Sequence, residues 1–218
     1  MSKPNKFSVL TLALLDKTLT KEELLKKVQQ DFGLIDFLFE GVGHSKAAVR
    51  YGCSNVLISL SVQNPEKLYP HFDFFVNLLG SKHRILTWNA LAIIANLTKV
   101  DVDKKFDAVF DKYYSYLGNE YMVTVANVVG NSVIIALAKP YLTPRIVDEL
   151  LTVDSLSVTP HLTEECKRVI AQGAIKSFDQ FFNQVQQKER VISFVKRHEN
   201  SSRKKLKTVA EKFLKKWN

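Results

Sequence analysis

The sequence predicts an all-α protein, folded as a right-handed α–α superhelical solenoid of about five helix pairs. Apolar residues recur at intervals of three and four positions, and no convincing hairpin turn interrupts them. Capping residues precede acidic first turns or a proline, as at Thr20, Asn64 and Thr163. A small residue also recurs about every 40 positions, which is the period of a two-helix solenoid repeat.

The longer helix of each pair is predicted in segments 46–61, 84–98, 121–138, 164–179 and 202–217. Aligned with one another, these segments place a small residue at Cys53, Ala90, Gly130, Ala171 and Ala210. Seven positions later comes a bulky apolar residue, at Leu60, Leu97, Leu137, Phe178 and Trp217. Two helical turns separate the members of each pair, so we expect both to be buried on one helix face.

Shorter apolar helices are predicted between these segments, at 34–39, 68–79, 106–117, 142–151 and 185–195. We therefore divide the chain into N-terminal capping helices at 1–33 and a solenoid at 34–217. The repeats are expected at approximately 34–65, 66–101, 102–140, 141–181 and 182–217. The alternative is an irregular helical bundle whose periodicity is accidental.

The apolar stretch 7–15 follows Lys3 and Lys6 and loosely imitates a secretory signal. No small residues mark a cleavage site after it, and its leucines continue a helical spacing. We expect a helix that packs against the first repeat.

The pattern of the first two repeats resembles the HEAT-repeat family. The resemblance is carried by Val49-Arg50-Tyr51-Gly52-Cys53 through Asn64-Pro65, and then by residues 86–101. It covers residues 34–217 and is degenerate from the third repeat onward, where Asn127 stands in place of the arginine, as Thr87 does in the second repeat. The resemblance implies a solenoid architecture and says little about activity.

Composition and charge exclude several classes of protein. Hydrophobic residues make up 46% of the 218 residues, and charged residues make up 24%, so the chain can bury a substantial core. No apolar run approaches the length of a membrane-spanning helix, so no membrane partner is expected. The 2 cysteines cannot form a disulfide framework, which favours a cytoplasmic location.

Residue types suited to catalysis or metal binding do not cluster in the sequence. No two of the 5 histidines fall four positions apart on one helix. The acidic stretch at 101–107 has Phe106 where a calcium loop needs glycine, so we expect Asp101 and Asp103 to cap a helix instead. Glycine-rich phosphate loops and nucleophile elbows are also absent from the sequence. We therefore expect a protein that is not an enzyme and has no metal, cofactor or small-molecule substrate.

The longer helices offer candidate partner-binding residues. In a stacked array these helices form one surface, which solenoids use for extended partners. The candidate residues are Arg50, Tyr51, Thr87, Trp88, Asn127, Asn131, Arg168, Gln172 and Lys207. The alternatives are a solvated polar face with local hydrogen bonds to the turns between repeats and, for Tyr51 and Trp88, a place in the core.

The basic C-terminus offers a candidate anion-binding patch. Residues 188–218 carry 11 Lys or Arg against 3 Glu, nearly all of the net charge of +9. The candidates on the last predicted helix are Lys204, Lys205, Lys212, Lys215 and Lys216. They could bind nucleic acid or an acidic protein, but the last repeat of a solenoid also needs a polar outer face for solubility.

Two functions remain open at this point. We expect a non-enzymatic scaffold that binds a protein partner. The alternative is a nucleic-acid-binding protein related to the HEAT-like alkylpurine DNA glycosylases, which resemble this chain in size, repeats and basic charge. Those enzymes grip a damaged nucleotide with tryptophans and an aspartate. Here the corresponding helices offer Tyr51 and Trp88, and the residue one turn after Trp88 is Ala92 rather than an acid.

Overall fold

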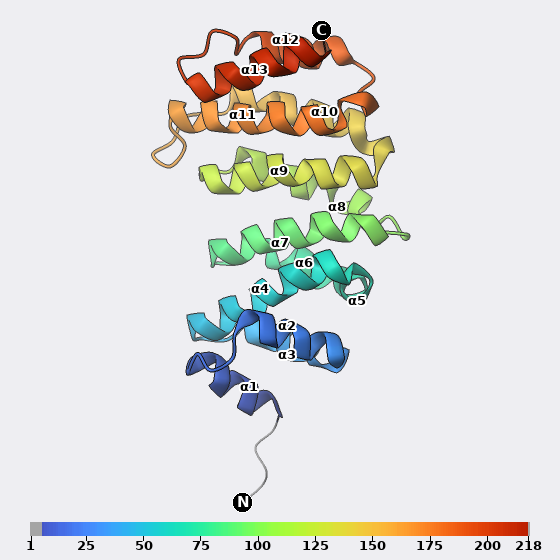
Figure 1. The fold of residues 1–218 in the computed structure, drawn as a ribbon, viewed down its shortest axis with the longest axis vertical. Coiled ribbons are helices and arrows are strands. Elements are labelled where there is room, and N and C mark those ends of the chain that lie inside the picture. The colour runs from blue at the N-terminus through green and yellow to red at the C-terminus, as the bar shows by residue number, and fades with distance from the viewer. Residues whose placement is uncertain (1–5, 218) are drawn as a thin grey trace, which may run out of the picture. The chain divides into compact units, whose positions relative to one another are not determined.

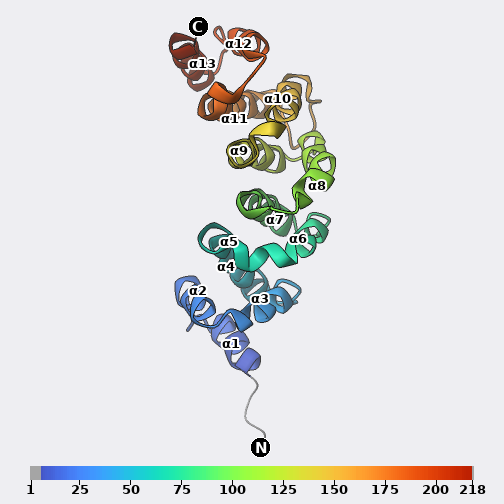
Figure 2. The ribbon, with the colours of Figure 1, turned by 90° about the vertical axis from the view of Figure 1, so that its right-hand side faces the viewer.

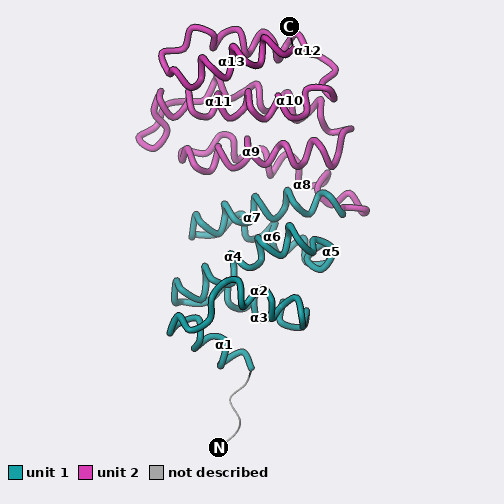
Figure 3. Tube along the Cα trace, viewed as in Figure 1, with its two compact units in different colours: residues 1–100 teal, residues 101–218 magenta. Residues whose placement is uncertain are grey.

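The computed structural model describes residues 6–217, and the predicted all-α fold is confirmed there (Figure 1). The described residues contain no β-strand, only an isolated bridge between Thr159 and Leu162. The chain forms two compact units, residues 1–100 and residues 101–218 (Figure 3). Residues 1–5 of the predicted capping region lie outside the described residues.

Unit 1 contains the capping helices and the first helix pairs. Its helices are α1 (Lys6–Leu15), α2 (Lys21–Gln30), α3 (Ile35–Val42), α4 (Ala47–Gln63), α5 (Pro65–Leu68), α6 (Phe72–Leu78) and α7 (Arg84–Leu97). Within this unit α2, α4 and α7 form one row, and α3 and α6 lie beside it (Figure 2). We call α4 and α7 the second helices of unit 1.

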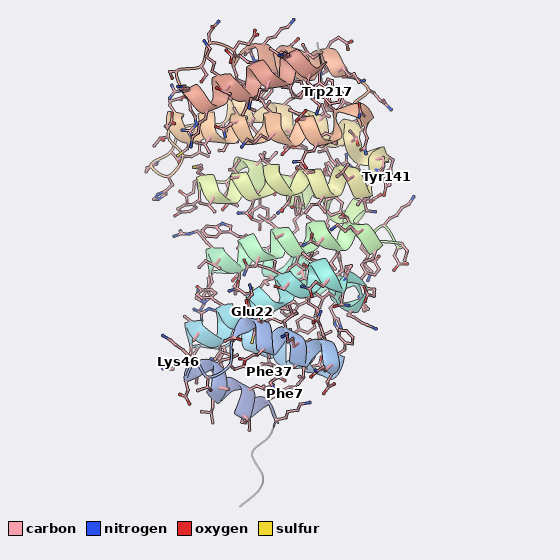
Figure 4. The ribbon with its side chains drawn as sticks, viewed as in Figure 1. Phe7, Glu22, Phe37, Lys46, Tyr141 and Trp217 are labelled. Atoms are coloured by element: carbon pink, nitrogen blue, oxygen red, sulfur yellow. The ribbon has the colours of Figure 1, made fainter. Side chains whose placement is uncertain are left out.

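Helix α1 packs on the first pair, as the sequence predicts. The rings of Phe7 and Phe37 lie 5.4 Å apart between α1 and α3, and both residues are labelled in Figure 4. Leu10 and Leu14 of α1 are buried, whereas Val9 and Leu12 are exposed. The helix therefore covers the end of the unit 1 core with one face.

Unit 2 repeats the arrangement. Its helices are α8 (Lys105–Tyr114), α9 (Met122–Ala138), α10 (Thr143–Leu151), α11 (Glu164–Phe181), α12 (Lys188–Lys196) and α13 (Lys204–Trp217). Within this unit α9, α11 and α13 form one row, and α8, α10 and α12 form the other (Figure 2). We call α9, α11 and α13 the second helices of unit 2.

The predicted side-chain caps are confirmed at Thr20 and Thr163, whereas the Asn64 side chain forms no capping hydrogen bond with α5. Thr20 and Glu23 form a reciprocal capping box at α2, and Thr163 accepts the Cys166 N–H at α11. Asp101 accepts the N–H groups of Lys105 and Phe106 at 2.8 and 3.0 Å, which agrees with its expected capping role. These contacts satisfy donors that a helix leaves unpaired at its first turn.

The predicted pattern of small residues is confirmed at four positions and wrong at one. Cys53, Ala90, Ala171 and Ala210 are buried, each 3% exposed or less. Gly130 is exposed. Of the bulky partners, Leu60, Leu97 and Phe178 are buried as expected, whereas Leu137 is 51% exposed and Trp217 is partly exposed. The residues of α9 that are buried seven positions apart include Val128 with Ile135 and Val129 with Ala136. Because α9 is apolar around most of its circumference, its sequence does not mark which face is buried.

Two buried hydrogen bonds fix the register of α4 against α7. Asn89 Nδ2 donates to Ser54 Oγ at 2.7 Å, and Asn96 Nδ2 donates to Ser61 Oγ at 3.0 Å. Each bond joins residues 35 positions apart. The two helices therefore run parallel and begin at the same edge of unit 1.

Candidate interaction surfaces

Two of the candidate residues of unit 1 are buried and donate hydrogen bonds to backbone carbonyl groups. Arg50 and Thr87 are 9% and 7% exposed. Arg50 Nη1 donates to the carbonyl oxygens of His44 and Ser45 at 2.8 and 3.1 Å. Thr87 Oγ1 donates to the carbonyl oxygen of Leu79 at 3.1 Å. Both side chains thus fold back onto the turn before their own helix, a contact that helical spacing alone does not reveal.

The other two candidates of unit 1 reach solvent. Tyr51 on α4 and Trp88 on α7 are partly exposed. Ile85, one turn before Trp88, is 39% exposed, and Asn55, one turn after Tyr51, is also exposed. Ile85 and Asn55 are not among the residues predicted from the sequence, although both lie at helical spacing from the aromatic candidates. The solvent-facing side of these helices is therefore mostly apolar and aromatic.

In unit 2 the two candidate asparagines lie on α9. Asn127 is partly exposed, and its Nδ2 donates to the carbonyl oxygen of Val123 at 2.8 Å. Asn131 is partly exposed, but its Nδ2 is buried and has no hydrogen-bond partner. Between and beside them α9 exposes apolar side chains, with Val123 45% and Leu137 51% exposed.

Of the three remaining candidates, Gln172 joins α11 to Arg203, the residue before α13, whereas Arg168 and Lys207 pair within their own helices. Arg168 Nη1 lies 3.3 Å from Glu165, and Gln172 Oε1 accepts a hydrogen bond from Arg203 Nε at 3.3 Å. Arg203 is also paired with Glu165, which links the two helices. Lys207 is exposed and lies 3.9 Å from Glu211 of its own helix. This part of the surface is polar.

Helix α13 exposes all of the candidate anion-binding lysines. Its apolar face, formed by Leu206, Ala210, Phe213 and Leu214, is buried, and α13 packs on α11 and α12. Lys216 Nζ is paired with Asp179 at 2.8 Å. Lys204, Lys205, Lys212 and Lys215 are exposed and form no ion pair in the part of the chain that the structure describes. Such an amphipathic helix suits a terminal repeat, because lysine heads remain hydrated while their stems cover apolar surface.

Unit 2 also contains an open polar cavity of about 490 Å³ between α11 and the segment from α12 to α13. Asp154 lies at its wall and accepts hydrogen bonds from Arg197 Nε and Nη2 at 3.0 and 2.8 Å, and His198 Nε2 lies 3.0 Å away. Burial by itself would raise the pKa of Asp154, but these hydrogen bonds outweigh it and lower the pKa. Lys167 at the same wall is paired with Glu164 at 3.5 Å. The basic groups of this cavity are therefore largely neutralised.

A buried ion pair in unit 2 was not foreseen from the sequence. Lys139 Nζ lies 2.9 Å from Asp101 Oδ2, and the two side chains are 4% and 0% exposed. Asp107 Oδ1 lies 3.2 Å from the same amine. Lys139 Nζ also donates a hydrogen bond to the hydroxyl of Tyr141 at 3.0 Å, and Tyr141 is labelled in Figure 4. Burial would lower the pKa of Lys139, but the hydrogen bonds to Asp101 and Tyr141 and the charge of Asp101 raise it. The pair ties the start of α8 to the end of α9.

Other chemistry is sparse in the described residues. Burial raises the pKa of Cys53 to about 12, so this thiol stays protonated and acts as a packing residue. A Cβ on Gly41 would overlap the Cys53 Sγ, which shows how closely α3 and α4 approach. Among residues 6–217, no group of three His, Cys, Asp or Glu is arranged to hold a metal ion. No helix within this range is long and apolar enough to cross a membrane.

Comparisons with known proteins identify the fold alone. No family model matches the chain, and no curated protein matches it. Among solved structures, the designed armadillo repeat protein YIII(Dq)4CqI is similar to it, with a TM-score of 0.64 and 16% sequence identity. The match covers 100% of this chain and 96% of the designed protein. The chain is therefore a helical repeat protein with an all-α solenoid fold.

Proposed function

We propose that this protein is a non-enzymatic scaffold that binds a protein partner on its second helices. The solenoid fold supports the proposal, because such folds typically present an extended surface for partners. The observation that carries it is the exposure of apolar side chains on these helices. Ile85 on α7 and Val123 and Leu137 on α9 are between 39% and 51% exposed. We infer that a partner covers these side chains together with the aromatic rings of Tyr51 and Trp88, because contiguous apolar patches mark contact surfaces.

Site-specific photocrosslinking tests this proposal. A benzophenone amino acid at position 85 or 123 should crosslink to a discrete protein in lysate of the source cells. Val102 provides a matched control, because it is an apolar residue that is 83% exposed and lies outside the second helices. The same label at position 102 should not give this product. Equal crosslinking from all three positions, or none from any, would contradict the proposal.

Nucleic-acid binding is the second candidate function, and the unpaired lysines of α13 favour it. Four exposed ammonium groups without carboxylate partners attract phosphates, and such binding weakens steeply as salt rises. The charge-reversal variant in the Discussion tests this function separately from the crosslinking experiment. The more specific resemblances, to HEAT repeats and to alkylpurine DNA glycosylases, remain predictions. Base release from alkylated DNA that is lost on Trp88→Ala would support the latter.

A further inference from the structure

Unit 1 contains a buried cation, Arg50, that has no anionic partner among the described residues. Arg50 is nine-tenths buried, and only its Nη1 has hydrogen-bond acceptors, both of them carbonyl oxygens. Its Nε–H is buried and has no acceptor. Arg50 forms no ion pair within the described residues. A guanidinium removed from water normally requires a carboxylate or phosphate, whose two oxygens match its planar donors.

The surroundings of Arg50 add further positive charge. Lys46 and Lys82 are exposed and form no ion pair in the described range. Lys46, which is labelled in Figure 4, lies at the N-terminal end of α4. Arg84 is exposed in the first turn of α7. The pKa of His83 is lowered, first by desolvation and then by the charges of Arg50 and Lys82. This direction agrees with the parallel register of α4 and α7, which places their starts at the same edge of unit 1.

The two helix starts lack the groups that normally neutralise them. The N-cap residues of α4 and α7 are Lys46 and His83, and neither side chain accepts a hydrogen bond from an N–H group of its helix. Neither first turn contains an acidic residue. In contrast, α2 begins with the cap Thr20 followed by Glu22 and Glu23. Because α4 and α7 begin at the same edge, their positive ends and the basic side chains reinforce one another.

We propose that this edge of unit 1, formed by the starts of α4 and α7, binds an acidic segment of a polypeptide, with a carboxylate of the segment reaching Arg50. The inference rests on the proposed scaffold function and names the chemistry of its partner. A protruding Asp or Glu side chain suits a guanidinium that is nine-tenths buried. The positive edge is also short, because α2, which packs on α4, carries exposed Glu22 and Glu23 in its first turn. A nucleic-acid backbone would need a longer positive surface.

Tyr51 and Trp88 give this site an apolar border. The Arg50 guanidinium lies 4.9 Å from the centre of the Tyr51 ring, and Trp88 follows Arg84 by one helical turn. The fitting ligand therefore combines acidic residues with an apolar residue. Trp88 also serves as a fluorescent reporter of the site, because the second tryptophan, Trp217, lies in unit 2.

Fluorescence anisotropy tests the site with a short labelled peptide of Glu, Gly and Leu, and with a matched peptide in which Gln replaces Glu. At low salt the full chain should bind the Glu peptide and not the Gln peptide. The double variant K46E/K82E should weaken binding about tenfold or more. The control K205E/K212E removes the same charge from exposed lysines of α13 in unit 2 and should change affinity less than about threefold. In a Trp217→Phe background, the Glu peptide should alter the emission of Trp88.

Arg50→Gln should abolish binding, and Arg50→Lys should retain only part of it, because lysine lacks the planar fork. If Arg50→Gln fails to fold, the proposal is judged by the loss of peptide affinity in K46E/K82E compared with the control K205E/K212E. Equal losses in the two double variants, or equal binding of the Glu and Gln peptides, would overturn the proposal. Tighter binding of single-stranded DNA with the same dependence on Lys46 and Lys82 would overturn it in favour of nucleic acid.

Failure of this site and failure of the scaffold function give different results. If position 85 or 123 crosslinks to a protein but the Glu peptide does not bind, the scaffold function stands and the acidic-segment site is wrong. If the Glu peptide binds with the expected dependence on Lys46 and Lys82 but no protein is crosslinked, the site stands and the scaffold function is wrong.

Discussion

Replacing Lys139 with methionine should destabilise unit 2 by about 3 kcal/mol. Methionine retains most of the aliphatic stem but leaves the Asp101 carboxylate, which is 0% exposed, without its ammonium partner at 2.9 Å. Removing one member of a buried ion pair typically costs about 3–5 kcal/mol, because the remaining charge stays desolvated. The lower end applies here, because Asp101 still accepts two backbone N–H bonds from the first turn of α8.

Urea unfolding monitored by the fluorescence of Trp217 measures this loss. A Trp88→Phe background leaves Trp217, which lies in the same unit as Lys139, as the reporting tryptophan. The control is Lys204→Met, which removes an exposed lysine without an ion pair and should change the free energy of unfolding by less than about 0.5 kcal/mol. In the double variant with Asp101→Ala, the total loss should be smaller than the sum of the single losses.

The pH dependence supplies a second check. The pKa of Lys139 is raised in the folded protein, so its contribution is complete below the pKa of an unfolded lysine, about 10.4, and is lost as pH rises through the folded pKa. The gap between the wild type and Lys139→Met should therefore stay constant from about pH 7 to pH 9. A loss near 0.5 kcal/mol, equal to that of the control, would refute the reasoning from burial.

Three further results are expected. Ala90→Leu should cost roughly 1–3 kcal/mol by overpacking, because Ala90 is 0% exposed, and an unchanged melting midpoint would count against close packing there. Asp154→Asn should lower stability at neutral pH by about 1 kcal/mol or less. Because the pKa of Asp154 is lowered, this gap should close as pH falls below about 4, and a gap that persists in acid would rule out the carboxylate as its source. Reversing Lys205, Lys212 and Lys215 to Glu should preserve the melting midpoint, since these three side chains are exposed and form no ion pair within the described residues. Salt-sensitive binding of DNA or RNA by the wild type that this variant loses would show that α13 does more than cover the end of unit 2.

The fold class could be predicted from sequence because amphipathic spacing and capping are local properties. The second helices begin within two residues of the predicted segments, and Thr20, Asp101 and Thr163 cap helices as expected. The prediction of the buried face was wrong for α9, where polar and apolar residues do not alternate clearly between faces. Helix α9 is apolar on most sides, so the exposed Gly130 resembled the buried small residues of the other helices.

The candidate site was less predictable, because burial of a polar residue depends on its partners. Arg50 and Thr87 lie at positions that a helical projection assigns to solvent, but carbonyl groups of the preceding turns draw them inward. Conversely, Ile85 is exposed although it is apolar. The burial of Arg50 and Thr87 has no signal in the spacing of the sequence, whereas Ile85 lies at helical spacing from Trp88.

The sequence by itself determined that this chain forms helices, where most of them begin, and that its positive charge is concentrated at the C-terminus. Only the tertiary structure decided which polar groups are paired. It joined Lys139 to Asp101 across 38 positions of sequence, and it left Arg50 buried without an acid. Helix formation depends on residues three or four apart, whereas the free energy of a charge depends on which groups replace the water around it.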